Sequence, residues 1–366
     1  MTGSTRRNFL TGAAACGAGA LLFRGSLIGQ AGLGPNGANP RRIDFHHHFQ
    51  TPDVVALANS NGRKFTSPWT LSKDLDDMDK NGTATALLSA MGQPTNLTFG
   101  DVGMARKATR MANEYAAKLT HDYPGRFGSF AALPLWYPDN DGCLQEIEYA
   151  LGALKADGFA MYTSHWDRYV GDASYMPVYE ELNRRRAVVF VHPHTPQCCE
   201  TIAVSKEVAQ TIVEYGADTT RAIANVVFSG LSKQLPNITW VFSHSGGMMP
   251  FVIERFLNGG LTAEIVPGIF TKGQDGKAKP GYPTGNDVIA ELRKFYYDTA
   301  QSSNPIAQGA LRQVVPVSQI VYGTDYWFRT AAETGKGLVT NKLYTPEELH
   351  AIDRGNAERI LPRFKA

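Results

Sequence analysis

The sequence predicts one α/β domain folded as a (β/α)8 TIM barrel, and two patterns support this. Short apolar, β-prone runs alternate with amphipathic helical segments from residue 41 to residue 366, with no break in composition. Eight such units in one domain are what a closed barrel of parallel strands requires. A doubly wound open sheet is the alternative, but no Gly-rich dinucleotide-binding pattern follows the first expected strand.

The expected strands are apolar runs rich in β-branched and aromatic residues. The fifth, from Ala187 to Val191, is continuously apolar, as expected of a strand buried on both faces. In chain order the runs are residues 42–45, 83–90, 127–133, 159–162, 187–191, 238–242, 295–297 and 320–322.

Apolar residues at helical spacing indicate helices between these strands. Leu71, Leu75 and Met78 repeat every three or four residues and are followed by Asn81 and Gly82, a helix-ending signal. Similar spacing predicts helices over residues 71–81, 104–119, 144–158, 179–186, 222–235 and 346–359.

Composition is that of a globular domain. The 366 residues are 43% hydrophobic, enough for a sizeable core. The 36 basic and 34 acidic residues leave a net charge of only +2, and no basic stripe suggests a nucleic-acid partner. Four cysteines are too few for a disulfide scaffold in a chain of this length.

Two segments lie outside the strand and helix pattern. Residues 1–40 contain Arg6 and Arg7 before an Ala/Gly-rich apolar run, which resembles a twin-arginine signal peptide followed by a linker. We therefore expect recognition by the twin-arginine machinery, cleavage after a small residue such as Ala31, and a periplasmic location. An uncleaved anchor or a disordered tail is the alternative. The long segment 259–286 predicts a lid, a subunit contact or a mobile surface insertion.

Histidines and one aspartate follow several of the expected strands. Barrel active sites lie at the carboxyl ends of the strands, where these side chains would converge. Alternation along the first strand directs His46 and His48 to one side and His47 to the other. The candidates at these strand ends are His46, His48, His192, His244 and Asp325.

Imidazoles together with a carboxylate suit a borderline divalent ion. Zinc is the first choice and manganese the second, and open coordination positions would make the site catalytic. A Cys/His site built on Cys198 and Cys199 is the rival, but adjacent cysteines rarely chelate one ion together.

Four stretches carry a resemblance to the amidohydrolase superfamily, and to its decarboxylase branch typified by aminocarboxymuconate-semialdehyde decarboxylase. Within that branch the chain is most similar to 6-methylsalicylate decarboxylase-like members, over nearly everything after residue 42. The stretches are Asp44-Phe45-His46-His47-His48, His192-Pro193, Ser243-His244-Ser245-Gly246-Gly247 and Tyr322-Gly323-Thr324-Asp325.

The resemblance implies a metal-dependent hydrolase-type barrel over residues 41–366, with one metal ion and a homodimeric assembly. It implies that His46, His48, His192 and Asp325 bind the metal, while His244 lies beside the metal-bound water or substrate. A carboxylated lysine bridging two metals is not implied, and the expected strand 159–162 has no lysine at its end.

The expected activity is non-oxidative decarboxylation of a small aromatic or unsaturated carboxylic acid, such as a 6-methylsalicylate-like acid. Asp325 or His244 would protonate the carbon that loses CO2. Arg63, Trp69 and His165 are candidate substrate contacts. The alternatives are a single-metal hydrolase of a lactone, ester or amide, and a non-catalytic exported binding protein.

Overall fold

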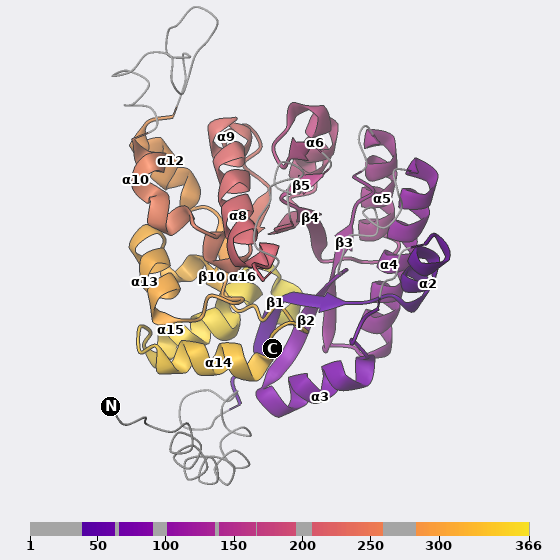
Figure 1. The fold of residues 1–366 in the computed structure, drawn as a ribbon, viewed down its shortest axis with the longest axis horizontal. Coiled ribbons are helices and arrows are strands. Elements are labelled where there is room, and N and C mark those ends of the chain that lie inside the picture. Colours follow the sequence, from indigo (N-terminus) through magenta and orange to yellow (C-terminus); the bar gives the residue numbers. More distant parts are fainter. Residues whose placement is uncertain are drawn as a thin grey trace, which may run out of the picture.

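Eight parallel strands form one sheet whose order follows the chain, β1-β2-β3-β4-β7-β8-β9-β10. The computed structural model describes residues 39–62, 66–90, 101–135, 139–165, 167–194, 207–258 and 283–365. Figure 1 shows the strands at the centre of the molecule and the helices around them. The strands are β1 (Arg42–Phe49), β2 (Thr83–Ala90), β3 (Phe127–Ala132), β4 (Gly158–Tyr162), β7 (Val188–His192), β8 (Thr239–Phe242), β9 (Tyr296–Asp298) and β10 (Ile320–Val321).

Hydrogen bonds between the first strand and the segment around the last close the sheet into a barrel. Phe45 N–H donates to the Tyr322 carbonyl at 2.9 Å, and Asp325 N–H donates to the His46 carbonyl at 2.8 Å. A further bond of 2.9 Å runs from His48 N–H to the Tyr326 carbonyl. The predicted eight-stranded barrel is therefore confirmed.

Rings from non-adjacent strands fill the barrel interior. Phe45 of β1 lies 5.4 Å from Phe130 of β3, and Phe130 lies 5.9 Å from Phe190 of β7, between ring centroids. Each pair has a strand between its members in the sheet, so the rings meet across the interior. A larger apolar cluster that includes Ile147, Trp240 and Leu311 packs the helices onto the outside of the barrel.

The helices form the outer layer. Each expected helix has a counterpart, and the helix at residues 71–81 has its predicted bounds and is capped by Gly82 with φ 74°. Among the described helices, none is both long and apolar enough to cross a membrane. They are α2 (Pro52–Ser60), α3 (Leu71–Asn81), α4 (Val102–Asp122), α5 (Asn140–Gly152), α6 (Met176–Arg184), α8 (Gln210–Phe228), α9 (Leu231–Gln234), α10 (Ile253–Leu257), α12 (Gly285–Leu292), α13 (Pro305–Val314), α14 (Ala331–Thr340), α15 (Pro346–His350) and α16 (Asn356–Ile360).

Several predicted helix boundaries were wrong for local reasons. The helix expected at 222–235 is two helices, because Gly230 interrupts it with φ 80°. The helix expected at 346–359 contains a π-helical turn, Ala351–Gly355, between α15 and α16. The one expected at 144–158 ends already at Gly152. The signal-peptide prediction and most of the segment 259–286 fall outside the described residues.

Candidate metal centre

Four buried side chains from three parts of the barrel meet at the carboxyl ends of the strands. His46 and His48 come from β1, His192 ends β7, and Asp325 follows β10. His48 Nε2 lies 3.1 Å from His46 Nε2 and 3.2 Å from His192 Nε2. Asp325 Oδ1 lies 3.2 Å and 3.1 Å from the Nε2 atoms of His46 and His48. The four ligand atoms all lie within 4.8 Å of one another.

Hydrogen bonds on the far side of each ring direct the Nε2 atoms inward. His46 Nδ1 donates to Asp298 Oδ2 at 2.7 Å, and His192 Nδ1 donates to the Pro193 carbonyl at 2.6 Å. His48 Nδ1 lies 3.2 Å from Ser89 Oγ. Because the carbonyl and the carboxylate can only accept, His46 and His192 carry their proton on Nδ1, which leaves the Nε2 lone pair facing the cluster.

The arrangement fits a cation. Imidazole lone pairs and a carboxylate oxygen at 3.1–3.2 Å from each other repel unless a positive charge lies among them. Asp325 Oδ1 is buried and accepts no hydrogen bond from any described residue, although buried polar atoms are normally paired. Three nitrogen donors and one oxygen donor suit a divalent transition metal.

The pKa values of the three histidines in the cluster reflect their burial and the nearby carboxylates. Burial alone would lower the pKa of His46, but the charges of Asp298 and Asp325 outweigh it and raise that pKa to about 10. Burial lowers the pKa of His48, and burial together with the neighbouring histidines holds the pKa of His192 well below its usual range. The two carboxylates therefore favour a positive charge in the pocket, which a bound metal ion would supply in place of a second proton on His46.

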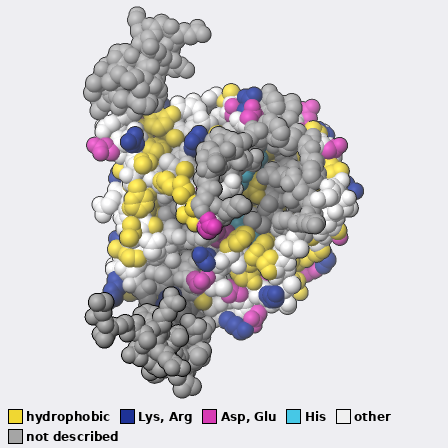
Figure 2. Space-filling view, viewed as in Figure 1, with side chains coloured by type: hydrophobic (Ala, Val, Ile, Leu, Met, Phe, Trp, Pro, Cys, Tyr) yellow, Lys and Arg dark blue, Asp and Glu magenta, His cyan; other side chains and the backbone are white. Residues whose placement is uncertain are grey.

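His244 lies beside the four-residue cluster. Its ring centroid is 4.9 Å from that of His46 and 5.7 Å from that of His192. Its Nδ1 donates to the Ala300 carbonyl at 3.0 Å, so its Nε2 is the nitrogen available to a ligand. Figure 2 shows histidine side chains at the centre of this face of the molecule.

Asp298 and Gln301 are parts of the site that the sequence interpretation missed. Asp298 ends β9 and links two of the histidines: Oδ2 accepts from His46 Nδ1, and Oδ1 accepts from His244 N–H at 2.8 Å. The Gln301 amide donates to Asp325 Oδ2. The position of Asp298 at a strand end was the available signal, but its role appears only when strands β1 and β9 are brought together.

Behind the cluster, His47 points away from it, as alternation predicted. It donates from Nδ1 to Asp44 Oδ2 at 2.9 Å and from Nε2 to Asp74 Oδ1 at 2.8 Å. Burial lowers the pKa of His47, but these two carboxylates raise it to about 10, so the ring is a buried cation. Asp44 also accepts from Thr324 Oγ1 at 2.6 Å and thereby ties β1 to the segment carrying Asp325.

The three candidate substrate contacts have different surroundings. Arg63 lies outside the described residues, as do Cys198 and Cys199. Trp69 is buried in an apolar cluster and donates from Nε1 to Asp74 Oδ2 at 2.8 Å, so packing and hydrogen bonding account for it without a substrate. His165 is 3% exposed rather than at the surface, and neither ring nitrogen has a hydrogen-bond partner in the described structure.

The chain is similar in sequence to several known proteins. The amidohydrolase family model matches residues 43–363. A 6-methylsalicylic acid decarboxylase of Penicillium expansum is 31% identical over 340 residues, covering 88% of this chain and 97% of the relative. Decarboxylase yanB of Aspergillus niger is 31% identical over 339 residues, covering 88% of each chain.

Solved structures share the fold. The crystal structure of a dihydroxybenzoic acid decarboxylase from Polaromonas sp. JS666, with bound manganese and 2-nitroresorcinol, superposes with a TM-score of 0.71 at 19% identity. That similarity covers 89% of this chain and 98% of the other. At this identity it demonstrates a common barrel.

Proposed function

Because the chain belongs to the amidohydrolase family, we propose that it is a metal-dependent decarboxylase that removes CO2 non-oxidatively from a small aromatic carboxylic acid. The decarboxylase expected from the sequence is borne out by relatives that match most of the chain. For the substrate we propose an ortho-hydroxylated benzoate of the 6-methylsalicylate type, supported by the name of one such relative.

The observation that carries the proposal is the convergence of His46, His48, His192 and Asp325 within 4.8 Å. We propose that these four residues hold one divalent ion, with zinc favoured by the donor set and manganese supported by its presence in a structural relative. When bound, the ion acts as a Lewis acid toward the substrate carboxylate and an adjacent oxygen and stabilises developing negative charge.

His244 is the better placed proton donor. Cleavage of the bond to the carboxyl carbon leaves an electron pair on the ring carbon, which must take up a proton as CO2 departs. Asp325 has Oδ1 in the ligand cluster, and its Oδ2 accepts from Gln301. Among the described residues the His244 ring is hydrogen-bonded only at Nδ1, so its Nε2 can carry a proton to the substrate.

His165 is the proposed substrate contact with the best structural support. His165 and the metal cluster share Tyr162 as a neighbour, whose ring centroid lies 6.2 Å from that of His165 and 6.0 Å from that of His192. An imidazole buried without a partner costs roughly 1–3 kcal/mol, which a substrate hydroxyl or a water would recover. Burial, with His194 contributing, lowers the pKa of His165 to about 3, so it would act as a neutral group.

Export and assembly stay proposals that rest on the sequence. The Arg6-Arg7 motif in residues 1–40 supports twin-arginine export to the periplasm. Subcellular fractionation of the wild-type chain and an Arg6→Lys, Arg7→Lys double variant tests it, and equal export of both would exclude it. A homodimer is proposed from family resemblance, and light scattering tests it.

The decisive assay is CO2 release by the metal-loaded protein from a panel of ortho-hydroxybenzoates that includes 6-methylsalicylate. His192→Ala, which removes one proposed ligand, is the control and is expected to lose both the metal and the activity. Lactones and esters in the same panel, with 18O-labelled water, test the hydrolase alternative. Incorporation of 18O into the product without CO2 release would show that the protein is a hydrolase rather than a decarboxylase.

A further inference from the structure

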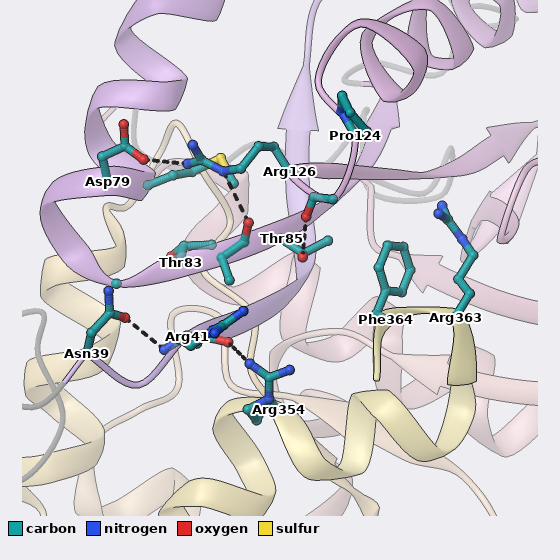
Figure 3. Close-up of a pocket in the computed structure, with 14 residues that line it drawn as sticks. Asn39, Arg41, Asp79, Thr83, Thr85, Pro124, Arg126, Arg354, Arg363 and Phe364 are labelled. Carbon is teal, nitrogen blue, oxygen red and sulfur yellow. Dashed lines mark hydrogen bonds and ion pairs between the residues drawn. The ribbon is translucent and has the colours of Figure 1, made fainter. Parts of the chain in front are cut away.

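A second pocket lies at the opposite end of the barrel from the metal centre. Its volume is about 580 Å³, and its lining includes residues at the starts of β1, β2 and β3. The catalytic residues of TIM barrels lie at the other end of the strands, so this pocket is separate from the candidate active site. Figure 3 shows its walls, which come from the chain near residue 40, from α3 and from the C-terminal turn containing Phe364.

The pocket is lined by four arginines and a single acidic residue, Asp79. Three of the arginines have a carboxylate nearby. Arg126 Nη2 lies 2.7 Å from Asp79 Oδ1, Arg354 Nε donates to Glu358 at 2.7 Å, and Arg363 pairs with a carboxylate beyond the lining.

Arg41 differs from the other three. Its guanidinium has no hydrogen-bond or ion-pair partner among the described residues, while its backbone is held on both sides. Its N–H donates to Asn39 Oδ1 at 2.9 Å, and its carbonyl accepts from Arg354 Nη1 at 3.0 Å. These bonds hold Arg41 at φ 51°, a conformation that residues other than glycine rarely adopt. The pocket thus presents one uncompensated positive charge on a fixed backbone.

One buried polar atom in the lining also lacks a partner. Thr83 is 3% exposed, and its Oγ1 has no hydrogen-bond partner in the part of the chain that the structure describes. Buried polar groups in native proteins are normally paired, so this hydroxyl points to a group that the described residues do not supply.

We propose that this pocket binds a small organic molecule through an oxyanion head group of the phosphate or carboxylate class. Arg41 supplies the charge and a planar set of donors, and the Thr83 hydroxyl supplies a further hydrogen bond. The volume exceeds that of an inorganic ion and falls in the range of small-molecule sites. Met78, Pro124 and Phe364 offer apolar surface to the body of the ligand.

Binding here would join distant parts of the chain. Arg41 precedes the first strand, whereas Arg354 and Phe364 belong to the last turns. None of the described residues that line the pocket is a histidine, and we assign it a binding role rather than a second reaction. This inference does not rest on the proposed decarboxylase activity.

The test is isothermal titration with inorganic phosphate, phenyl phosphate and benzoate of the metal-loaded protein and, to exclude binding at the metal centre, of its His192→Ala variant. We expect saturable binding of phenyl phosphate or benzoate, and the ligand preferred identifies the head group. Arg41→Gln and Thr83→Val should weaken that binding about tenfold, the loss expected for one charge-assisted hydrogen bond. Decarboxylation by Arg41→Gln should stay at the wild-type rate.

Arg184→Gln is the matched control, because Arg184 is an exposed arginine that pairs with Glu181 outside the pocket. Weakening in either pocket variant with the control unchanged supports the site. The proposal is overturned if no probe binds saturably, if both pocket variants bind as the wild-type chain does, or if the control weakens binding equally. The last result would mean that the probes bind through general attraction to positive charge rather than at this pocket.

Discussion

Replacing Asp298 with asparagine is expected to weaken metal binding although Asp298 is not one of the four proposed ligands. The carboxylate accepts three hydrogen bonds: from His46 Nδ1 at 2.7 Å, from His244 N–H at 2.8 Å and from Ala300 N–H at 2.9 Å. An asparagine of the same shape keeps one oxygen. If that oxygen stays with the two backbone N–H groups, the new NH2 group faces His46 Nδ1–H, and two donors oppose each other.

His46 must then move its proton to Nε2, which removes the lone pair that faces the cluster. Losing such a partner of a metal-bound histidine typically costs about 10- to 100-fold in metal affinity, or about 1.4–2.7 kcal/mol. The opposite orientation of the amide preserves His46 but leaves the N–H groups of His244 and Ala300 without an acceptor, which displaces His244 and lowers the decarboxylation rate at saturating metal.

Competition titration against a metal chelator, followed by kinetics at saturating metal, measures both effects. Asp74→Asn is the matched control, since Asp74 is a buried carboxylate that contacts His47 and Trp69 rather than a proposed ligand. It should lower the free energy of unfolding while retaining metal affinity within a few-fold. Wild-type affinity together with a wild-type rate in Asp298→Asn would refute this reasoning.

Three further predictions concern the fold. Arg42→Met should lower the free energy of unfolding by about 3–5 kcal/mol in urea titration, because it leaves buried Asp353 without the partner now at 2.8 Å. Gly247→Ala should lower the thermal midpoint measurably by calorimetry, since a Cβ there would lie 2.2 Å from the Gly216 carbonyl oxygen at φ 65°; an unchanged midpoint would contradict this packing. Hydrogen bonds from two arginines at the end of α6, opposed by partial burial, lower the pKa of Glu181 from 4.5 to about 2. Its stabilisation is therefore present above about pH 4.5 and lost as the pH falls toward 2, so Glu181→Gln should differ from the wild-type chain by at most about 1 kcal/mol at pH 7 and by less at pH 3.

Periodicity and strand-end position were sufficient to predict the barrel and the converging residues His46, His48, His192, His244 and Asp325, whereas the division into four metal ligands and His244 came from the family resemblance. The strands could be predicted because parallel strands buried on both faces leave continuous apolar runs in the sequence. Helices such as α14 were missed because its sequence, AAETGKGLVT, contains two glycines and little apolar periodicity. Tertiary packing, rather than intrinsic preference, stabilises that helix.

Roles that depend on contacts between distant strands could not be predicted. Asp298 is one of many acidic residues in the sequence, and only its contacts with His46 and His244 distinguish it. Trp69 was considered for substrate stacking because it follows the first strand, but its Nε1 donates to Asp74 five residues further on, and Asp74 in turn accepts from the distant His47 of β1. The residues near each position in the sequence do not reveal such long-range contacts.

The first strand and the segment around the last strand meet at a seam that closes the barrel. This seam also carries candidate metal ligands. Thr324 and Asp44, which hydrogen-bond across the seam, are 280 residues apart in the chain. Joining such distant segments is costly in chain entropy and is expected late in folding. An ion held by His46 and His48 on one side and by Asp325 on the other would fasten the first and last strands together. Metal uptake and completion of the barrel are then thermodynamically linked, so withdrawal of the ion should increase hydrogen exchange first at the amides of Phe45, His48 and Asp325.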